Sequence, residues 1–158
     1  MSDTAHQPAA GAAASEVPRG SRTVPGDPDA GNTVVLDTSA LLYWTLSPER
    51  LSEAAAVALR NARRTLVVSV SLWEIALKQE RGALELPITI DEYIARLRAI
   101  GGLELHSLSV ATAVAGAALE WAHRDPADRW ITAFAAEHDA PLVTSNERIR
   151  AFYPAAVW

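Results

Sequence analysis

The 158-residue sequence contains no cysteine, which excludes disulfide bonds and thiolate metal sites. It also lacks any run of about 18 or more consecutive apolar residues, the length that a membrane-spanning helix requires. Basic residues are not in excess either, because 14 Lys and Arg stand against 19 Asp and Glu and give a net charge of −5. With 49% hydrophobic residues, we expect a soluble globular protein that neither spans a membrane nor holds nucleic acid by a bulk positive field.

Residues 1–32 lack apolar periodicity and are rich in Ala, Gly, Pro and Ser, a composition that predicts a disordered tail. They also lack the charged start and continuous apolar core of a secretory signal, so we expect a cytoplasmic protein. A natural extension and a start codon placed too far upstream both remain open as explanations of this tail. Residues 33–158 then form one domain, as the length suggests.

Short apolar stretches alternate with amphipathic ones throughout this domain. The sequence predicts strands over 33–36, 66–69, 103–105, 142–144 and 156–158. Apolar residues at helical spacing predict intervening helices, including 51–62, 90–97 and 110–121. This alternation is typical of an α/β protein with a mostly parallel sheet and crossover helices.

One acid, Asp37, lies at the junction between the first predicted strand and an apolar helix. The carboxyl end of a strand is where open α/β sheets bind ligands. The alternative is turn chemistry, since Asp37, Thr38 and Ser39 are all good helix N-caps. This stretch alone supports the two interpretations equally.

Two further acidic positions follow. Glu74 lies in an otherwise apolar segment, and a buried carboxylate needs a cation or hydrogen-bond donors. Its alternative role is in a capping box with Ser71, which would return it to the helix N-terminus. Asp125 before Pro126 predicts an N-cap, which places Asp128 in the first helical turn. A simple cap accounts for only one of these two aspartates.

A third group of polar residues, Ser145, Asn146 and Glu147, follows the strand predicted over 142–144. A capping box between Thr144 and Glu147 is the alternative explanation. Because parallel strands bring their carboxyl ends to one edge of a sheet, we expect the polar groups that follow the strands predicted over 33–36, 66–69 and 142–144 to converge there.

In this order, the motifs LDTSALL (36–42), SLWEIALK (71–78), HRDPADRW (123–130) and LVTSNERI (142–149) resemble the PIN domain. Within that family they are similar to the VapC-type toxin ribonucleases of bacterial type II toxin–antitoxin pairs. The resemblance extends over residues 33–158. It implies a three-layer α/β/α sandwich with a central, mostly parallel sheet, and an endoribonuclease that depends on Mg²⁺, with Mn²⁺ as an alternative.

The resemblance also implies site residues. Asp37, Glu74 and Asp128 would be catalytic, and Asp37 and Asp128 would bind the metal. Four polar residues would support them: Thr38, Ser39, Asp125 and Asn146. Many family members carry Asp at the position of Asn146, so this site has one carboxylate fewer, which argues against tight binding of a second metal.

Other side chains near these motifs receive more general predictions. Three basic residues are candidates for binding the RNA phosphate: Arg124, Arg129 and Lys78. The four histidines are scattered and are interpreted as structural or exposed rather than as metal ligands: His6, His106, His123 and His138. Trp73 and Trp130 lie within two residues of site acids and are expected to wall the pocket.

The resemblance further implies a homodimer and a cognate VapB-type antitoxin that covers an apolar groove. Four residues after the first acid are candidates for that groove, although a simple core role is equally supported: Leu41, Leu42, Tyr43 and Trp44. Two alternatives to the toxin remain open. One is a PIN-fold binding module with weak or no nuclease activity, and the other is a different metal-dependent phosphoesterase.

Overall fold

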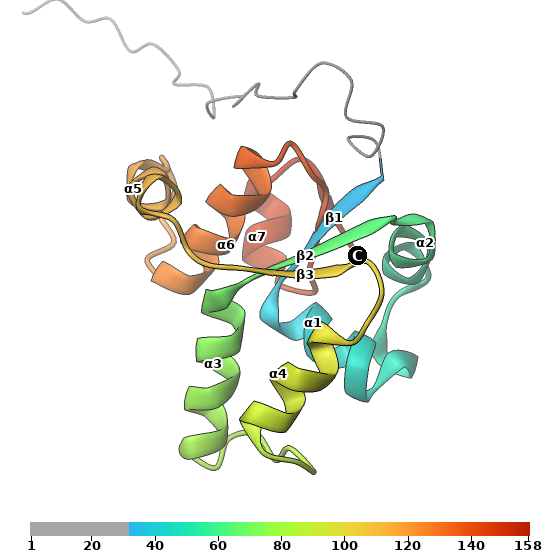
Figure 1. The fold of residues 1–158 in the computed structure, drawn as a ribbon. Coiled ribbons are helices and arrows are strands. Elements are labelled where there is room, and N and C mark those ends of the chain that lie inside the picture. Colours follow the sequence, from blue (N-terminus) through green and yellow to red (C-terminus); the bar gives the residue numbers. More distant parts are fainter. Residues whose placement is uncertain (1–31) are drawn as a thin grey trace, which may run out of the picture.

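The computed structural model describes residues 32–158, which form a five-stranded sheet in the order β3-β2-β1-β4-β5 (Figure 1). Every neighbouring pair of strands is parallel. The strands are β1 (Thr33–Leu36), β2 (Arg64–Val68), β3 (Leu103–His106), β4 (Leu142–Val143) and β5 (Ala156–Val157). The predicted parallel α/β fold is confirmed, whereas the tail predicted over residues 1–32 lies, except for Asn32, outside the described residues.

Helices cover both faces of this sheet and make three layers (Figure 1). They are α1 (Thr38–Leu46), α2 (Glu53–Asn61), α3 (Ser69–Glu80), α4 (Ile90–Arg98), α5 (Val110–Ala118), α6 (Pro126–Glu137) and α7 (Glu147–Phe152), with a short 3₁₀ helix, η1 (Pro48–Arg50). Side chains alternate between the layers, as the pleat of a strand requires. Val34 and Leu36 pack with α1, α2 and α4, whereas Val35 packs with α6 and α7.

Local sequence explains where several elements begin and end. Helix α4 starts at a capping box, in which Thr89 and Glu92 each bond the other's backbone N–H. Gly102 precedes β3 with φ +79°, and a Cβ there would lie 2.8 Å from the carbonyl oxygen of Arg63. Only glycine fits this turn without strain. Both signals were visible in the sequence.

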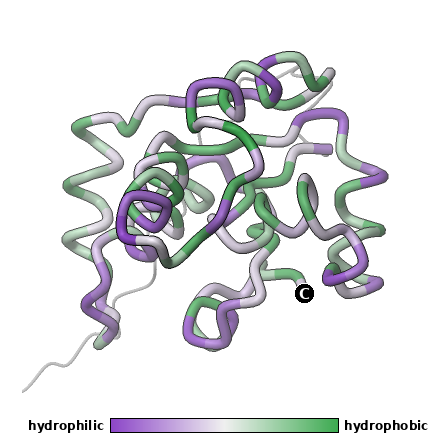
Figure 2. Tube along the Cα trace, turned by 90° about the horizontal axis from the view of Figure 1, so that it is seen from below, coloured by the Kyte–Doolittle hydropathy of each residue, from purple (hydrophilic) through white to green (hydrophobic). Residues whose placement is uncertain are grey.

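Helix α5 packs against α6 at Gly116, where a Cβ would lie 2.7 Å from Cδ1 of Trp130. Glycine therefore permits the close approach of the two helices. In Figure 2, green runs mostly through the centre of the molecule, and purple gathers mostly at turns and helix ends. Among residues 32–158, no helix combines the length and apolar character needed to cross a membrane.

Candidate active site

Asp37 directly follows β1 and is the N-cap of α1. Its Oδ1 accepts hydrogen bonds from the backbone N–H of Ala40 at 2.6 Å and from Oγ of Ser39 at 2.9 Å. Its Oδ2 accepts one from the Thr144 hydroxyl, which comes from the residue after β4. The N-cap interpretation of Asp37 is confirmed. The same carboxylate also lines the cavity described below, where its role in binding a ligand stays a prediction.

The electrostatic environment of this carboxylate favours its neutral form. Asp37 is only 4% exposed, and burial raises its pKa above the ordinary value of 3.8. The hydrogen bonds from Thr144, Ala40 and Ser39 act in the opposite direction, and the negative charge of Asp128 adds to the increase. The ionised form is thus held by donors, and among residues 32–158 no cation contributes to offsetting its burial.

Glu74 points from α3 toward the same region. Helix α3 begins at Ser69, immediately after β2, and has no side-chain cap, so the capping-box alternative for Glu74 is wrong. The Thr38 hydroxyl donates to Oε2 of Glu74, and Nζ of Lys78 lies 3.9 Å from Oε1. Burial raises the pKa of Glu74 above 4.5, although Thr38 and Lys78 oppose this and Asp128 adds to it.

Asp128, in the first turn of α6, is held from two sides. Its Oδ2 accepts from Nδ2 of Asn146 at 2.8 Å and lies 2.6 Å from Nε2 of His123. Asn146 is itself the N-cap of α7, where its Oδ1 accepts from the backbone N–H of Arg148 at 3.0 Å. These two bonds fix the orientation of the amide. The alternative in which Thr144 caps this helix is wrong, because Asn146 occupies that position.

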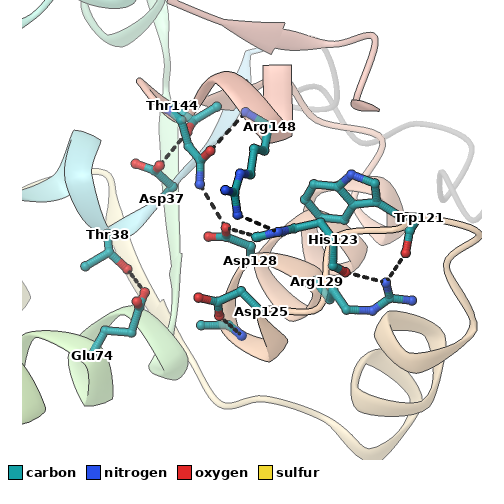
Figure 3. A network of polar contacts seen from close by, with 12 residues as sticks. Asp37, Thr38, Glu74, Trp121, His123, Asp125, Asp128, Arg129, Thr144 and Arg148 are labelled. Carbon is teal, nitrogen blue, oxygen red and sulfur yellow. Dashed lines mark hydrogen bonds and ion pairs between the residues drawn. The ribbon is translucent and has the colours of Figure 1, made fainter. Parts of the chain in front are cut away.

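These side chains surround a cavity of about 260 Å³, called the acid pocket below (Figure 3). It is lined by Asp37, Thr38, Ser39, Glu74, Lys78, Asp125, Asp128, Ser145 and Asn146. The structure therefore brings together the three predicted catalytic acids and all four predicted supporting residues. Four carboxylates face one ammonium group, and such an oxygen-rich, negative donor set fits a hard divalent cation.

The structure adds one residue to this cluster that the sequence analysis set aside. His123, Asp125 and Asp128 can each offer one ligand atom, and these atoms all lie within 4.8 Å of one another. Asp125 also caps α6, accepting from the backbone N–H of Ala127 at 3.0 Å. His123, which the sequence analysis interpreted as structural or exposed rather than as a metal ligand, thus lies among the candidate ligand atoms. Its place in the same motif as the two aspartates was the signal that could have found it.

Arg129 has a different place from the one expected. Its guanidinium donates to five backbone carbonyls around the end of α5, those of Gly116, Ala117, Leu119, Trp121 and His123. Figure 3 shows it on the far side of Asp128 from Asp37 and Glu74. These bonds commit the donors of the side chain to the loop before α6, so the prediction that Arg129 binds phosphate is wrong.

Other predicted residues divide between the acid pocket and the rest of the fold. Lys78 lines the pocket, whereas Arg124 lines a neighbouring cavity. The prediction that Trp73 and Trp130 line the pocket is wrong. Trp73 is 54% exposed, and Trp130 packs against the core and Gly116.

The four residues predicted to line an apolar groove lie in different surroundings. Leu41 is fully buried, and Leu42 packs against the core. Tyr43 lies against Trp158, with 5.8 Å between ring centroids. Trp44 alone of the four lines a groove, a cavity of about 420 Å³ between α1 and α4.

Comparison with known proteins places this arrangement in a family. The sequence matches the PIN domain over residues 34–153. The chain belongs to the PIN domain family. It is 32% identical over 132 residues to Ribonuclease VapC22 of Mycobacterium tuberculosis, a match that covers 80% of this chain and 98% of that protein.

Two solved structures share the fold of this PIN domain. A toxin–antitoxin complex from Klebsiella pneumoniae matches with a TM-score of 0.56 and 20% identity, over 79% of this chain and 96% of that one. VapBC2 from Rickettsia felis, bound to a DNA fragment from its promoter, matches with a TM-score of 0.56 and 16% identity, over 78% and 95%. The acid pocket lies within the matched region, at the carboxyl ends of the PIN domain's central strands.

Proposed function

We propose that this PIN domain is a Mg²⁺-dependent endoribonuclease and the toxin of a toxin–antitoxin pair. The observation that carries the proposal is the convergence of four carboxylates, from three separate segments, on one cavity with a single ammonium group. The 32% identity to a ribonuclease, over 98% of that protein's length, makes RNA the substrate class to test.

The residues present fit a divalent cation. Asp37 and Asp128 would hold it, with Asp125 and His123 close to Asp128. When bound, Mg²⁺ or Mn²⁺ neutralises charge on the phosphodiester and lowers the pKa of an attacking water. The raised pKa of Asp37 supports this assignment, because a buried carboxylate that receives no cation from the described residues, 32–158, gains most from an added positive charge.

Glu74 is the residue we assign to proton transfer. Thr38 occupies Oε2 of its carboxylate, which leaves Oε1 facing Lys78 and the cavity. Burial raises the pKa of Glu74 toward neutral pH, and a carboxylate with a higher pKa is a stronger general base. Glu74 would therefore take the proton of the attacking water at Oε1, and Lys78 would stabilise negative charge beside it.

Thr38 and Ser39 have supporting roles in this scheme. Each donates its hydroxyl to a site carboxylate, Thr38 to Glu74 and Ser39 to Asp37. Ser39 also lies 2.8 Å from the Ser145 hydroxyl, which links α1 to the end of β4. The hydroxyls thus hold the acids in fixed orientations and need not contact RNA.

The proposed partners are an antitoxin and a second copy of this chain, in the cytoplasm where RNA is available. The groove between α1 and α4, with Trp44, Leu46 and Ile88 in its lining, supplies an apolar surface for an antitoxin. Trp73 on α3, at 54% exposed, is a candidate contact for the homodimer.

Induced expression of the wild type and of Asp37→Asn in a bacterial host tests this function. We expect growth arrest by the wild type alone. With the purified proteins, we expect cleavage of total RNA that requires Mg²⁺ and stops in EDTA. Glu147→Gln is the matched control, because Glu147 is an exposed acid that does not line the pocket. Folded wild-type protein that cleaves only small phosphoesters would indicate another phosphoesterase, and protein that cleaves neither would indicate a binding module.

A further inference from the structure

A second cavity adjoins the acid pocket, and the charged side chains that line it are basic rather than acidic. It has a volume of about 450 Å³ and lies between the loop that precedes α6 and the helix α7. Its lining, called the arginine pocket below, consists of Trp121, Ala122, His123, Arg124, Arg148 and Ala151. Two guanidinium groups and no carboxylate line it, whereas the acid pocket has four carboxylates and one ammonium group.

The imidazole of His123 forms the wall between the two pockets. Its Nε2 lies 2.6 Å from Oδ2 of Asp128, on the acid side, and its Nδ1 lies 3.3 Å from Nη1 of Arg148 (Figure 3). The ring is 10% exposed and packs against Trp121, with 4.7 Å between centroids. A mostly buried ring with a polar contact at each nitrogen therefore links Arg148 to Asp128.

Asn146 also links Asp128 to Arg148, through the backbone of Arg148. Its side chain donates to Asp128 and accepts from the N–H of Arg148. Arg148 is thus placed relative to the acids by two contacts, one to its side chain and one to its main chain. Trp121 stacks on Phe152 at 4.6 Å with an interplanar angle of 11°, which supports the floor of the arginine pocket from α7.

Charge and geometry favour a phosphate as the ligand. Guanidinium groups match phosphate oxygens with paired donors, and Arg124 and Arg148 are both exposed. Arg129, the third arginine nearby, is committed to backbone carbonyls and does not compete. A polyanion whose reacting phosphate lies in the acid pocket must pass next to the histidine wall. Its neighbouring phosphate would then meet the arginines.

We infer that the arginine pocket is a substrate subsite, in which Arg148 and Arg124 bind the backbone phosphate of a single-stranded RNA nucleotide next to the one cleaved. This inference rests on the proposed ribonuclease function and extends it by a second binding position. The two arginines act in binding, and the acids of the first pocket act in the chemistry. The subsite holds the RNA in register so that one phosphodiester reaches Asp37, Glu74 and Asp128.

The test is the binding of a short fluorescein-labelled single-stranded RNA of mixed sequence to the full chain, measured by fluorescence anisotropy in EDTA so that the RNA stays intact. The variants are Arg124→Ala, Arg148→Gln and the double variant. Arg148→Gln removes the charge but keeps a donor for His123. Arg150→Ala is the matched control, because Arg150 is an exposed arginine on the same helix that lines neither pocket.

Removal of either guanidinium should raise Kd about tenfold. The double variant should also reduce the slope of log K against log salt by about 0.7, because the two arginines bind one phosphate and each phosphate that a protein neutralises on a single strand contributes about 0.7. Arg150→Ala should change neither quantity. A merely structural role for Arg148 would lower thermal stability but would leave the salt slope unchanged.

The two levels of the proposal fail in different ways. Wild-type protein that cleaves RNA in Mg²⁺, together with a double variant of unchanged Kd and salt slope, would overturn the subsite and leave the ribonuclease intact. The arginines would then be available to an acidic segment of a protein partner. Wild-type protein that neither binds nor cleaves RNA would overturn both.

Discussion

Glu74 and Glu104 are both partly exposed glutamates next to the sheet, and the chain treats them in opposite ways. Glu104 on β3 receives two hydrogen bonds from the Arg64 guanidinium, at 2.7 and 2.9 Å, and Arg64 lowers its pKa to about 2. Glu74 accepts a hydrogen bond from the Thr38 hydroxyl, and the ammonium group of Lys78 lies 3.9 Å away. Burial raises the pKa of Glu74. At Glu104 the compensating cation is a side chain of the protein itself, Arg64. In the acid pocket four carboxylates face one ammonium group, as the proposed cation site requires.

The same substitution at the two glutamates should therefore have opposite consequences, and the larger effect is at Glu74. We expect Glu74→Gln to lower kcat for RNA cleavage by about 10² to 10⁴-fold, the usual contribution of a general base. The free energy of unfolding of the metal-free protein should be unchanged or higher, because a partly buried charge is removed. Cleavage rates in Mg²⁺ and urea unfolding in EDTA measure the two quantities. Near-wild-type kcat in the folded variant would contradict the assignment.

Mg²⁺ should stabilise the protein most at neutral pH. The raised pKa values of Asp37 and Glu74 mean that the folded state binds more protons than the unfolded state above 3.8 and 4.5. In EDTA, the contribution of these groups to stability is present at low pH and is lost as pH rises through their folded pKa values. A Mg²⁺ concentration of about 100 times Kd should restore about 2.7 kcal/mol.

Urea unfolding over a pH series, with EDTA or with Mg²⁺, measures this effect. Glu74→Gln and Asp37→Asn should each weaken the response to Mg²⁺. An unfolding free energy at pH 7 that does not respond to the ion would show that these acids do not form a cation site.

Asn146 is the residue at which the charge of the pocket can be increased. Asn146→Asp replaces the donor to Asp128 with a second carboxylate, since the present Nδ2 lies 2.8 Å from Oδ2. In EDTA we expect the free energy of unfolding to fall by about 1 to 3 kcal/mol, the cost of an unsatisfied buried polar group. In Mg²⁺ the loss should shrink, because the new carboxylate can bind the ion.

Asn146→Ser is the control for this substitution, because Ser retains an N-cap for α7 but is too short to reach Asp128. Calorimetric titration with Mg²⁺ or Mn²⁺ would show whether the added carboxylate raises affinity. Equal metal affinity in the Asp and Ser variants would mean that position 146 does not contact the ion.

The smallest effect is expected at Glu104. Its side chain is 40% exposed, so solvent screening limits the ion pair with Arg64, and Glu104→Gln should cost less than about 1 kcal/mol. Because the folded pKa lies below 4.5, the stabilisation is present above pH 4.5 and is lost as pH falls toward 2. RNA cleavage should be unchanged. Acid unfolding of the two proteins tests this, and a difference that persists at pH 2 would contradict it.

The sequence predicted the centre of the sheet because β1 and β2 are short runs rich in β-branched residues and are almost entirely buried. The predicted first strand coincides with β1, and the convergence of Asp37 and Glu74 followed from placing acids after parallel strands. Asp128 follows a helix rather than a strand, so its place in the site came from the family resemblance. Boundaries were less accurate where a helix follows a strand directly. Helix α3 begins at Ser69 without a loop, so a capping pattern two residues later was misleading.

Two further errors concern His123 and Arg129, in and just after the segment between α5 and α6. The path of that segment determines whether Arg129 turns to carbonyls or to the pocket, and whether His123 reaches Asp128. Neither outcome follows from local periodicity, because both depend on contacts with α5 and α7. Arg148 was overlooked for the same reason, since its partner His123 lies 25 residues away in sequence.

The bond between Asp37 and Thr144 joins residues 107 positions apart, and Asp128 depends on Asn146 in the same way. During synthesis, a chain that has emerged only as far as α6 already carries every acid of the pocket. It still lacks the hydroxyl and the amide that hold two of those acids in place. The acid pocket is therefore completed only late in translation, and we expect a chain that terminates before β4 to lack nuclease activity.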